Sequence, residues 1–110
     1  MTTNDTLRDL ATSTQAFYDR FGVTPVLENT IMNFSEETRE LIEAAREGHD
    51  QAHIAEEAGD VIVTALGICF ASGVSIDQLI EQVYKVIAKN DAKNHETHHY
   101  VDGKIRRRSK

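Results

Sequence analysis

Two short acidic stretches contain the residues of this sequence that are best suited to chemistry. Glu37 and Glu40 lie three positions apart in one stretch, and Glu57 and Asp60 lie three positions apart in the other. Because an α-helix turns by about 100° per residue, the members of each pair fall on adjoining positions of a helix, next to apolar residues. The sequence therefore predicts four carboxylates that face inward from two helices.

Carboxylates in an apolar environment need a compensating partner. An unpaired buried carboxylate costs several kcal/mol or becomes protonated, and the neighbouring stripes contain hardly any Lys or Arg. Oxygen ligands favour magnesium, with manganese as a substitute, over zinc or copper. We therefore expect a Mg2+ site whose ligands are Glu37, Glu40, Glu57 and Asp60. The alternative is that the acids are solvated residues on two helix surfaces.

Apolar spacing predicts the helices that position these acids. A first helix is expected from Leu7 up to Gly22. Thr24 is the expected N-cap of the second helix, with Pro25 in its first turn, where the missing N–H costs nothing. The second helix carries the first acidic stretch and should end near Gly48. A short turn there would bring the third helix back antiparallel, with the two acidic pairs in register.

The third helix is expected between an N-cap at Asp50 and a stop at Gly73, and it is so apolar that it should be buried on nearly all sides. Ser75 and Gln78 form a capping-box signature for a fourth helix. Residues 94–110 are polar, with a turn signal at Asp102-Gly103, and we expect an irregular tail. The fold class predicted is all-α, a four-helix bundle with a short polar C-terminal tail.

Composition limits the functions that remain open. The chain has 110 residues, a formal charge of −6, one Cys and 40% hydrophobic residues. This predicts a single domain over residues 1–110 that gains stability from self-association or a ligand. The acidic balance argues against a nucleic-acid duplex as partner. No membrane span, leader or disulfide framework is indicated, so we expect a cytoplasmic protein.

The acidic pattern matches that of a known family. Glu36-Glu37-x-x-Glu40, followed after a helical gap by Glu57-x-x-Asp60, resembles the signature of the MazG-like all-α nucleoside triphosphate pyrophosphatases. Weaker similarities at 73–76, 89–93 and 102–104 suggest the phosphoribosyl-ATP pyrophosphatase-like branch. The resemblance implies an oligomeric enzyme that uses magnesium to cleave between the α and β phosphates of a nucleotide. It also implies that the four acids hold the metal and that Glu36 holds a further ion or orients water.

The resemblance also directs attention to candidate catalytic and substrate-binding residues. Glu36 is the candidate catalytic base, although on a helical wheel it faces away from Glu37. Asn33 lies on the side of the acids and could read a base edge. Asn90 is expected on the inner stripe of the fourth helix, and it joins three lysines as candidate ligands of phosphate oxygens. These lysines are Lys89, Lys93 and Lys104; cations at a helix C-terminus that interact with its dipole are the alternative.

Other residues have less specific interpretations. His53 is expected either beside the Glu57 carboxylate or at the surface near a helix start. The basic run of the last seven residues, which ends at Lys110, is typical of a solvated tail. The leading function is a nucleoside triphosphate pyrophosphohydrolase, with a role in nucleotide-pool house-cleaning as one setting. Phosphoribosyl-ATP hydrolysis and a noncatalytic helical interaction module are the alternatives.

Overall fold

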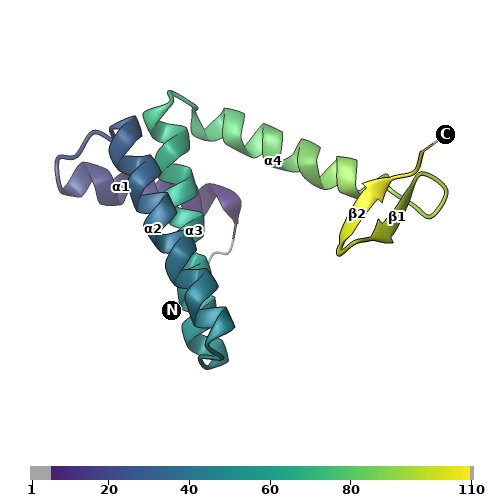
Figure 1. Cartoon of the computed structure of the whole chain (residues 1–110). Helices are drawn as coiled ribbons and strands as arrows, with labels where there is room; N and C mark the ends of the chain where they lie inside the picture. The colour runs from purple at the N-terminus through teal and green to yellow at the C-terminus, as the bar shows by residue number, and fades with distance from the viewer. Residues whose placement is uncertain (1–5, 110) are drawn as a thin grey trace. The chain divides into compact units, whose positions relative to one another are not determined.

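Four helices and a two-stranded sheet make up residues 6–109, the part of the chain described by the computed structural model (Figure 1). The helical core agrees with the predicted all-α fold class. In chain order the elements are α1 (Leu7–Arg20), α2 (Leu27–Arg46), α3 (Gln51–Ala71), α4 (Ile76–Asp91), β1 (His98–Val101) and β2 (Lys104–Arg107).

The chain divides into two compact units, Met1–Leu79 and Ile80–Lys110. The first unit contains α1, α2, α3 and the first residues of α4. The second unit contains the rest of α4 and the hairpin of β1 and β2. A single domain over residues 1–110 stays a prediction.

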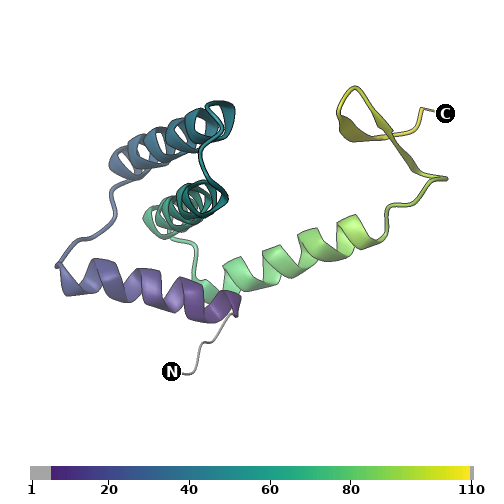
Figure 2. The same ribbon diagram turned by 90° about the horizontal axis from the view of Figure 1, so that it is seen from below.

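In the first unit, α2 and α3 lie side by side as an antiparallel pair (Figures 1 and 2). The turn between them is short because Gly48 adopts a φ of 72°, which glycine tolerates without strain. The predicted N-cap at Asp50 is confirmed, since its carboxylate accepts a hydrogen bond from the His53 N–H at 2.8 Å. This turn sets the two acidic stretches against each other.

The core of the first unit is small and depends on a close helix contact. Gly67 of α3 is buried, and a Cβ built on it would lie 2.6 Å from the Tyr18 hydroxyl of α1. A side chain at this position would therefore force the Tyr18 ring to shift. The other buried residues of the three helices have small or medium side chains: Ala11, Thr14, Thr30, Ala44 and Leu66.

The predicted start of α2 is wrong by two residues. The backbone of Val26 is extended, and its carbonyl accepts the first helical hydrogen bond, from the Thr30 N–H at 3.0 Å. Thr24 and Pro25 therefore precede the helix, and α2 begins without a side-chain cap. By contrast, the predicted capping box of α4 is confirmed by reciprocal bonds between Ser75 and Gln78, at 2.9 and 3.1 Å.

The sequence predicts that the third helix is buried on nearly all sides, and within a single copy of the chain this prediction is wrong. Within α3 only Leu66 and Gly67 are buried, and Ile62 is 50% exposed. The reason is that α1 and α2 cover only part of the surface of α3. No helix within residues 6–109 combines the length and apolar character that crossing a membrane would require.

In the second unit, the expected irregular tail is instead an antiparallel hairpin. His98 pairs with Arg107, and Val101 pairs with Lys104. The predicted turn at Asp102-Gly103 is present, with φ angles of 53° and 76°. Two successive positive φ angles match the twist of paired strands, which explains why this dipeptide forms a hairpin rather than a loose tail. Lys110 lies outside the described residues.

Candidate metal centre

The α2 and α3 pair brings three glutamates together. Glu37 and Glu40 come from α2 and Glu57 comes from α3, and one carboxylate oxygen of each lies within 4.8 Å of the others. We call these three residues the glutamate cluster. Their meeting follows from the helical period, which places 37 and 40 on one side of α2, and from the antiparallel return of α3.

The cluster is electrostatically uncompensated. The Oε2 atoms of Glu37 and Glu57 are buried and have no hydrogen-bond partner. Burial raises the pKa of Glu37, and the charges of Glu40, Asp60 and Glu57 raise it further. Burial likewise raises the pKa of Glu57, with a second contribution from Glu40. The Oε2 atom of each residue therefore lacks the hydrogen-bond partner that a buried carboxylate oxygen normally has.

A divalent cation fits this donor set. The three side chains offer only carboxylate oxygens, which are the ligands that hard cations such as Mg2+ prefer. Within residues 6–109 no Lys or Arg forms an ion pair with the cluster. A cation held between Glu37 and Glu57 would supply a partner for the two orphaned oxygens, so the residues present suit a metal.

His53 lies beside the Glu57 carboxylate, which is one of the two positions expected from the sequence. Its Nε2 is 3.5 Å from Oε1 of Glu57, one helical turn away. A protonated His53 lowers the pKa of Glu57 and so opposes part of the effect of burial. The His49 ring packs against that of His53, with ring centroids 4.9 Å apart. These contacts hold the Glu57 carboxylate from one side and leave its Oε2 free.

The remaining predicted acids are placed differently. Asp60 is exposed and is not one of the three grouped residues, but its charge raises the pKa of both Glu37 and Glu57. It therefore lies near enough to affect the cluster, and its role as a ligand stays a prediction. Glu36 is exposed and is also outside the group.

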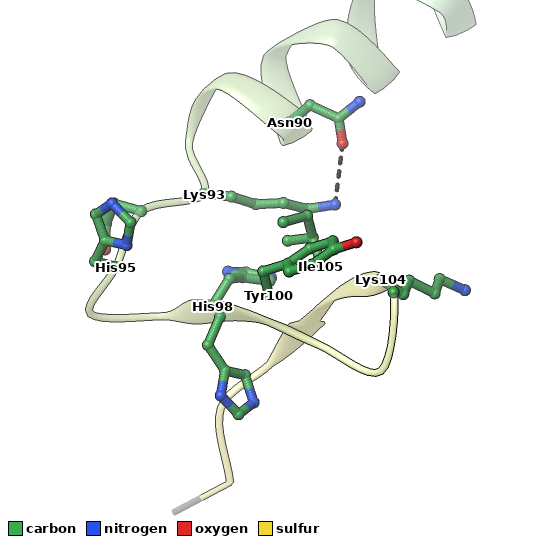
Figure 3. Close-up of a pocket in the computed structure, with 10 residues that line it drawn as sticks. Asn90, Lys93, His95, His98, Tyr100, Lys104 and Ile105 are labelled. Atoms are coloured by element: carbon green, nitrogen blue, oxygen red, sulfur yellow. Dashed lines mark hydrogen bonds between the residues drawn. The ribbon is translucent and has the colours of Figure 1, made fainter.

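The predicted phosphate ligands are partly brought together in the second unit. Asn90, Lys93 and Lys104 line a cavity of about 730 Å³ between the end of α4 and the hairpin (Figure 3). Lys89 is exposed and does not line this cavity, and Asn33 is exposed on α2. The expected burial of Asn90 is wrong, because α4 has no buried residue. Its Oδ1 instead accepts a hydrogen bond from Lys93 Nζ at 3.0 Å.

The sequence did not predict the contribution of the hairpin to this cavity. The strands add an aromatic residue, an aliphatic residue and two histidines, and the loop before them adds a third histidine. A signal was present: alternating strand-type residues flank Asp102-Gly103, a dipeptide strongly associated with hairpins. The residues missed are His95, His98, His99, Tyr100 and Ile105.

Comparison with known protein families gives a match over most of the helical part of the chain. Residues 7–86 match the family model of PRA-PH, described as phosphoribosyl-ATP pyrophosphohydrolase. The match includes α1, α2, α3 and most of α4, and hence both acidic stretches, but ends before Lys89. No curated protein and no solved structure gives a significant match to the chain.

The match covers well over half of the chain and agrees with the all-α core and the glutamate cluster. Members of this family are metal-dependent hydrolases of phosphoric anhydrides. The chain is thus a pyrophosphohydrolase that belongs to the phosphoribosyl-ATP pyrophosphohydrolase family, within the MazG-like all-α nucleoside triphosphate pyrophosphatase superfamily.

Proposed function

We propose that this protein uses Mg2+ to hydrolyse the bond between the α and β phosphates of a nucleotide, releasing pyrophosphate and a nucleoside monophosphate. The observation that carries the proposal is the pair of buried, partnerless oxygens of Glu37 and Glu57, next to Glu40. A pyrophosphohydrolase whose clustered glutamates have no Lys or Arg partner among the described residues needs a cation both for its own stability and for its polyanionic substrate.

In this proposal Glu37, Glu40, Glu57 and Asp60 hold Mg2+, with Mn2+ as a substitute. When bound, the metal neutralises charge on the phosphates and acidifies the attacking water. His53 orients Glu57 through the 3.5 Å contact with Oε1. Glu36 is the proposed base that accepts the proton of the water. Because it is exposed outside the cluster, this role requires either a second subunit or a bend in the helix.

The proposed substrate contacts lie on α2, α4 and the hairpin. Asn33 would read the base, one helical turn before Glu37. Asn90 and Lys93 form a hydrogen-bonded pair that presents nitrogen donors, as phosphate recognition requires. Together with Lys89 and Lys104 they are proposed to contact phosphate oxygens.

The reacting group is proposed to be a triphosphate chain. Two kinds of substrate contain such a chain: phosphoribosyl-ATP and the ordinary nucleoside triphosphates. The family match favours phosphoribosyl-ATP. The metal chemistry of the glutamate cluster, considered alone, suits any nucleoside triphosphate. Parallel assays of phosphoribosyl-ATP and the common nucleoside triphosphates, with detection of pyrophosphate, will separate the two: a preference of at least tenfold in kcat/KM identifies the substrate.

Self-association is part of the proposal. Large apolar side chains are exposed on the paired helices, including Leu27, Met32, Ile42 and Ile62. An exposed apolar surface of this kind is typical of an interface. Light scattering at micromolar concentration should give a dimer or tetramer, whereas a mass of 12.3 kDa would contradict this expectation.

The bond that is cut can be tested directly. Hydrolysis in oxygen-18 water should place the label in the nucleoside monophosphate, because water attacks the α phosphorus. Label in orthophosphate would show attack at the terminal phosphate and overturn the proposal. Metal binding with no hydrolysis of any nucleotide would instead support a noncatalytic module.

A further inference from the structure

The cavity of the second unit has a charge opposite to that of the whole chain. Its lining includes two lysines and three histidines, and none of the described residues that line it is Asp or Glu. The protein as a whole carries a formal charge of −6. A wall of this composition attracts anions without the help of a metal ion.

The polar groups of the cavity include unused donors. Lys93 Nζ donates to Asn90 Oδ1 at 3.0 Å, as Figure 3 shows. This bond fixes the carboxamide so that its oxygen is occupied and its NH2 group is available, while the ammonium keeps two further protons. Two adjacent nitrogen donors of this kind suit the oxygens of a phosphate group.

The loop that contributes Asn94 and His95 to the cavity lining is held by hydrogen bonds within the second unit. Arg108 Nε donates to the His95 carbonyl at 2.7 Å, and the Arg108 N–H donates to the Thr97 carbonyl at 2.9 Å. Asn94 Oδ1 accepts from the backbone N–H groups of Glu96 and Thr97. Such preorganisation reduces the entropic cost of binding a ligand.

An apolar surface lies beside the donors. Tyr100 and Ile105 are directly opposite each other in the hairpin, and they are 73% and 51% exposed. In Figure 3 both lie beneath the Lys93 side chain. An exposed aromatic ring next to phosphate donors suits a sugar or base attached to the phosphate.

From this geometry we infer that the cavity binds the phosphomonoester of a sugar phosphate or nucleoside monophosphate directly, with no bridging cation. The inference extends the phosphate contacts proposed above for Lys93 and Lys104 to a complete pocket with its own ligand chemistry. The inference concerns the second unit alone. The residues that line the cavity lie beyond the part of the chain that the family model matches.

The test is calorimetric titration of the full chain in excess EDTA, so that no metal-bridged binding contributes. The probes are AMP, ribose 5-phosphate, inorganic phosphate and adenosine. AMP and ribose 5-phosphate should bind, and adenosine should bind at least tenfold more weakly than AMP. Lys93→Gln should weaken AMP binding at least tenfold. Tyr100→Ala should weaken AMP binding more than inorganic phosphate binding.

Matched controls keep this result specific. Lys85 is a lysine of the same helix that pairs with Glu81 at 3.3 Å and does not line the cavity, so Lys85→Gln should leave AMP affinity unchanged. Glu57→Gln should also bind AMP normally in EDTA, even where hydrolysis is lost. Phosphate binding by a protein that hydrolyses nothing would therefore support the pocket while contradicting the proposed function.

Three outcomes would overturn the inference. The first is no binding of AMP or ribose 5-phosphate at millimolar concentration. The second is unchanged affinity in a folded Lys93→Gln, Lys104→Gln double variant, with circular dichroism as the check on folding. The third is displacement of AMP by a short DNA duplex at far lower concentration, which would make the basic surface a nucleic-acid site.

Discussion

The glutamate cluster and the C-terminal cavity have opposite charges, yet both suit phosphate chemistry. In the cluster, buried carboxylate oxygens lack partners, so phosphate can approach only with a cation between the two. In the cavity, lysine, histidine and amide donors are available to an anion directly. Under the two proposals, an acidic chain uses one phosphate site that requires metal and another that does not.

The two regions also differ in how their residues are held. Helical periodicity positions the cluster on two long packed helices. A two-residue turn and a few loop hydrogen bonds position the cavity. Changes to the first region should therefore act on metal binding and turnover, and changes to the second on anion affinity.

The largest expected effect is on turnover. Glu57→Gln removes a charged ligand from the cluster and should lower kcat by roughly 100-fold or more, because transition-state charge stabilisation is lost. Glu56→Gln is the matched control, since Glu56 is an exposed neighbour outside the cluster. Steady-state pyrophosphate release measures both. Similar rates for the two variants would contradict the assignment of the cluster.

Metal binding should stabilise the fold. Mg2+ at 100 times its Kd should add about 2.7 kcal/mol to the free energy of unfolding, because only the folded protein binds it. Asp60→Asn should remove most of the resulting rise in Tm, and Glu56→Gln should keep it. Differential scanning calorimetry with and without millimolar Mg2+ measures the shift. A Tm that does not respond to Mg2+ or Mn2+ in the unaltered protein counts against the site.

Much of the first region is predictable from the sequence, and the reason is physical. Regular helical spacing fixes which residues share a face, so the approach of Glu37, Glu40 and Glu57 follows once the turn at Gly48 is recognised. Spacing does not fix how completely neighbours cover a helix. For that reason the exposure of Asp60 and of Ile62 was not predicted.

The second region was less predictable because its structure depends on pairing between short strands. Four-residue strands such as His98–Val101 have weak patterns of their own, and their polar composition resembles a solvated tail. Only the turn at Asp102-Gly103 was recognised. Without the register that pairs Tyr100 with Ile105, no cavity could be deduced from the residues.

Stability should depend on pH in opposite directions in the two regions. The folded-state pKa values of Glu37 and Glu57 are raised above 4.5, so the metal-free cluster favours protonated acids. The first unit should therefore lose stability as pH rises from about 4.5 through the raised values, and bound Mg2+ should remove this loss. Hydrogen exchange of the α2 amides as a function of pH, with and without Mg2+, measures this loss of stability.

The hairpin should show the opposite dependence. Burial and the nearby Lys93 charge lower the pKa of His98 below 6.5, so the folded hairpin disfavours the imidazolium. Its stability should fall as pH decreases from about 6.5 through the lowered value. Hydrogen exchange of the β1 amides measures this, and His98→Asn should abolish it. Parallel pH responses in the two units would contradict the contrast.

The smallest expected effect concerns the turn. Gly103 has a φ of 76°, and Gly103→Ala should destabilise the hairpin by about 1 kcal/mol because a side chain is strained there. It should weaken AMP binding while leaving the Mg2+-dependent rise in Tm intact. Asp102→Asn is the control, since Asn tolerates the positive φ of that position. Loss of the Tm rise in Gly103→Ala would show that the two regions are not independent.

The close approach of Tyr18 to Gly67 gives the protein a built-in optical reporter. The chain has three tyrosines and no tryptophan, so its near-ultraviolet absorption at 280 nm comes from phenol rings. Tyr84 and Tyr100 are 63% and 73% exposed, whereas the Tyr18 hydroxyl sits over the backbone of α3. In solvent-perturbation difference spectra the two exposed rings respond strongly to added solvent, whereas the half-buried Tyr18 ring responds less until α1 leaves α3. Tyr18→Phe therefore isolates the signal of helix docking, and undocking of α1 is observable without any attached dye.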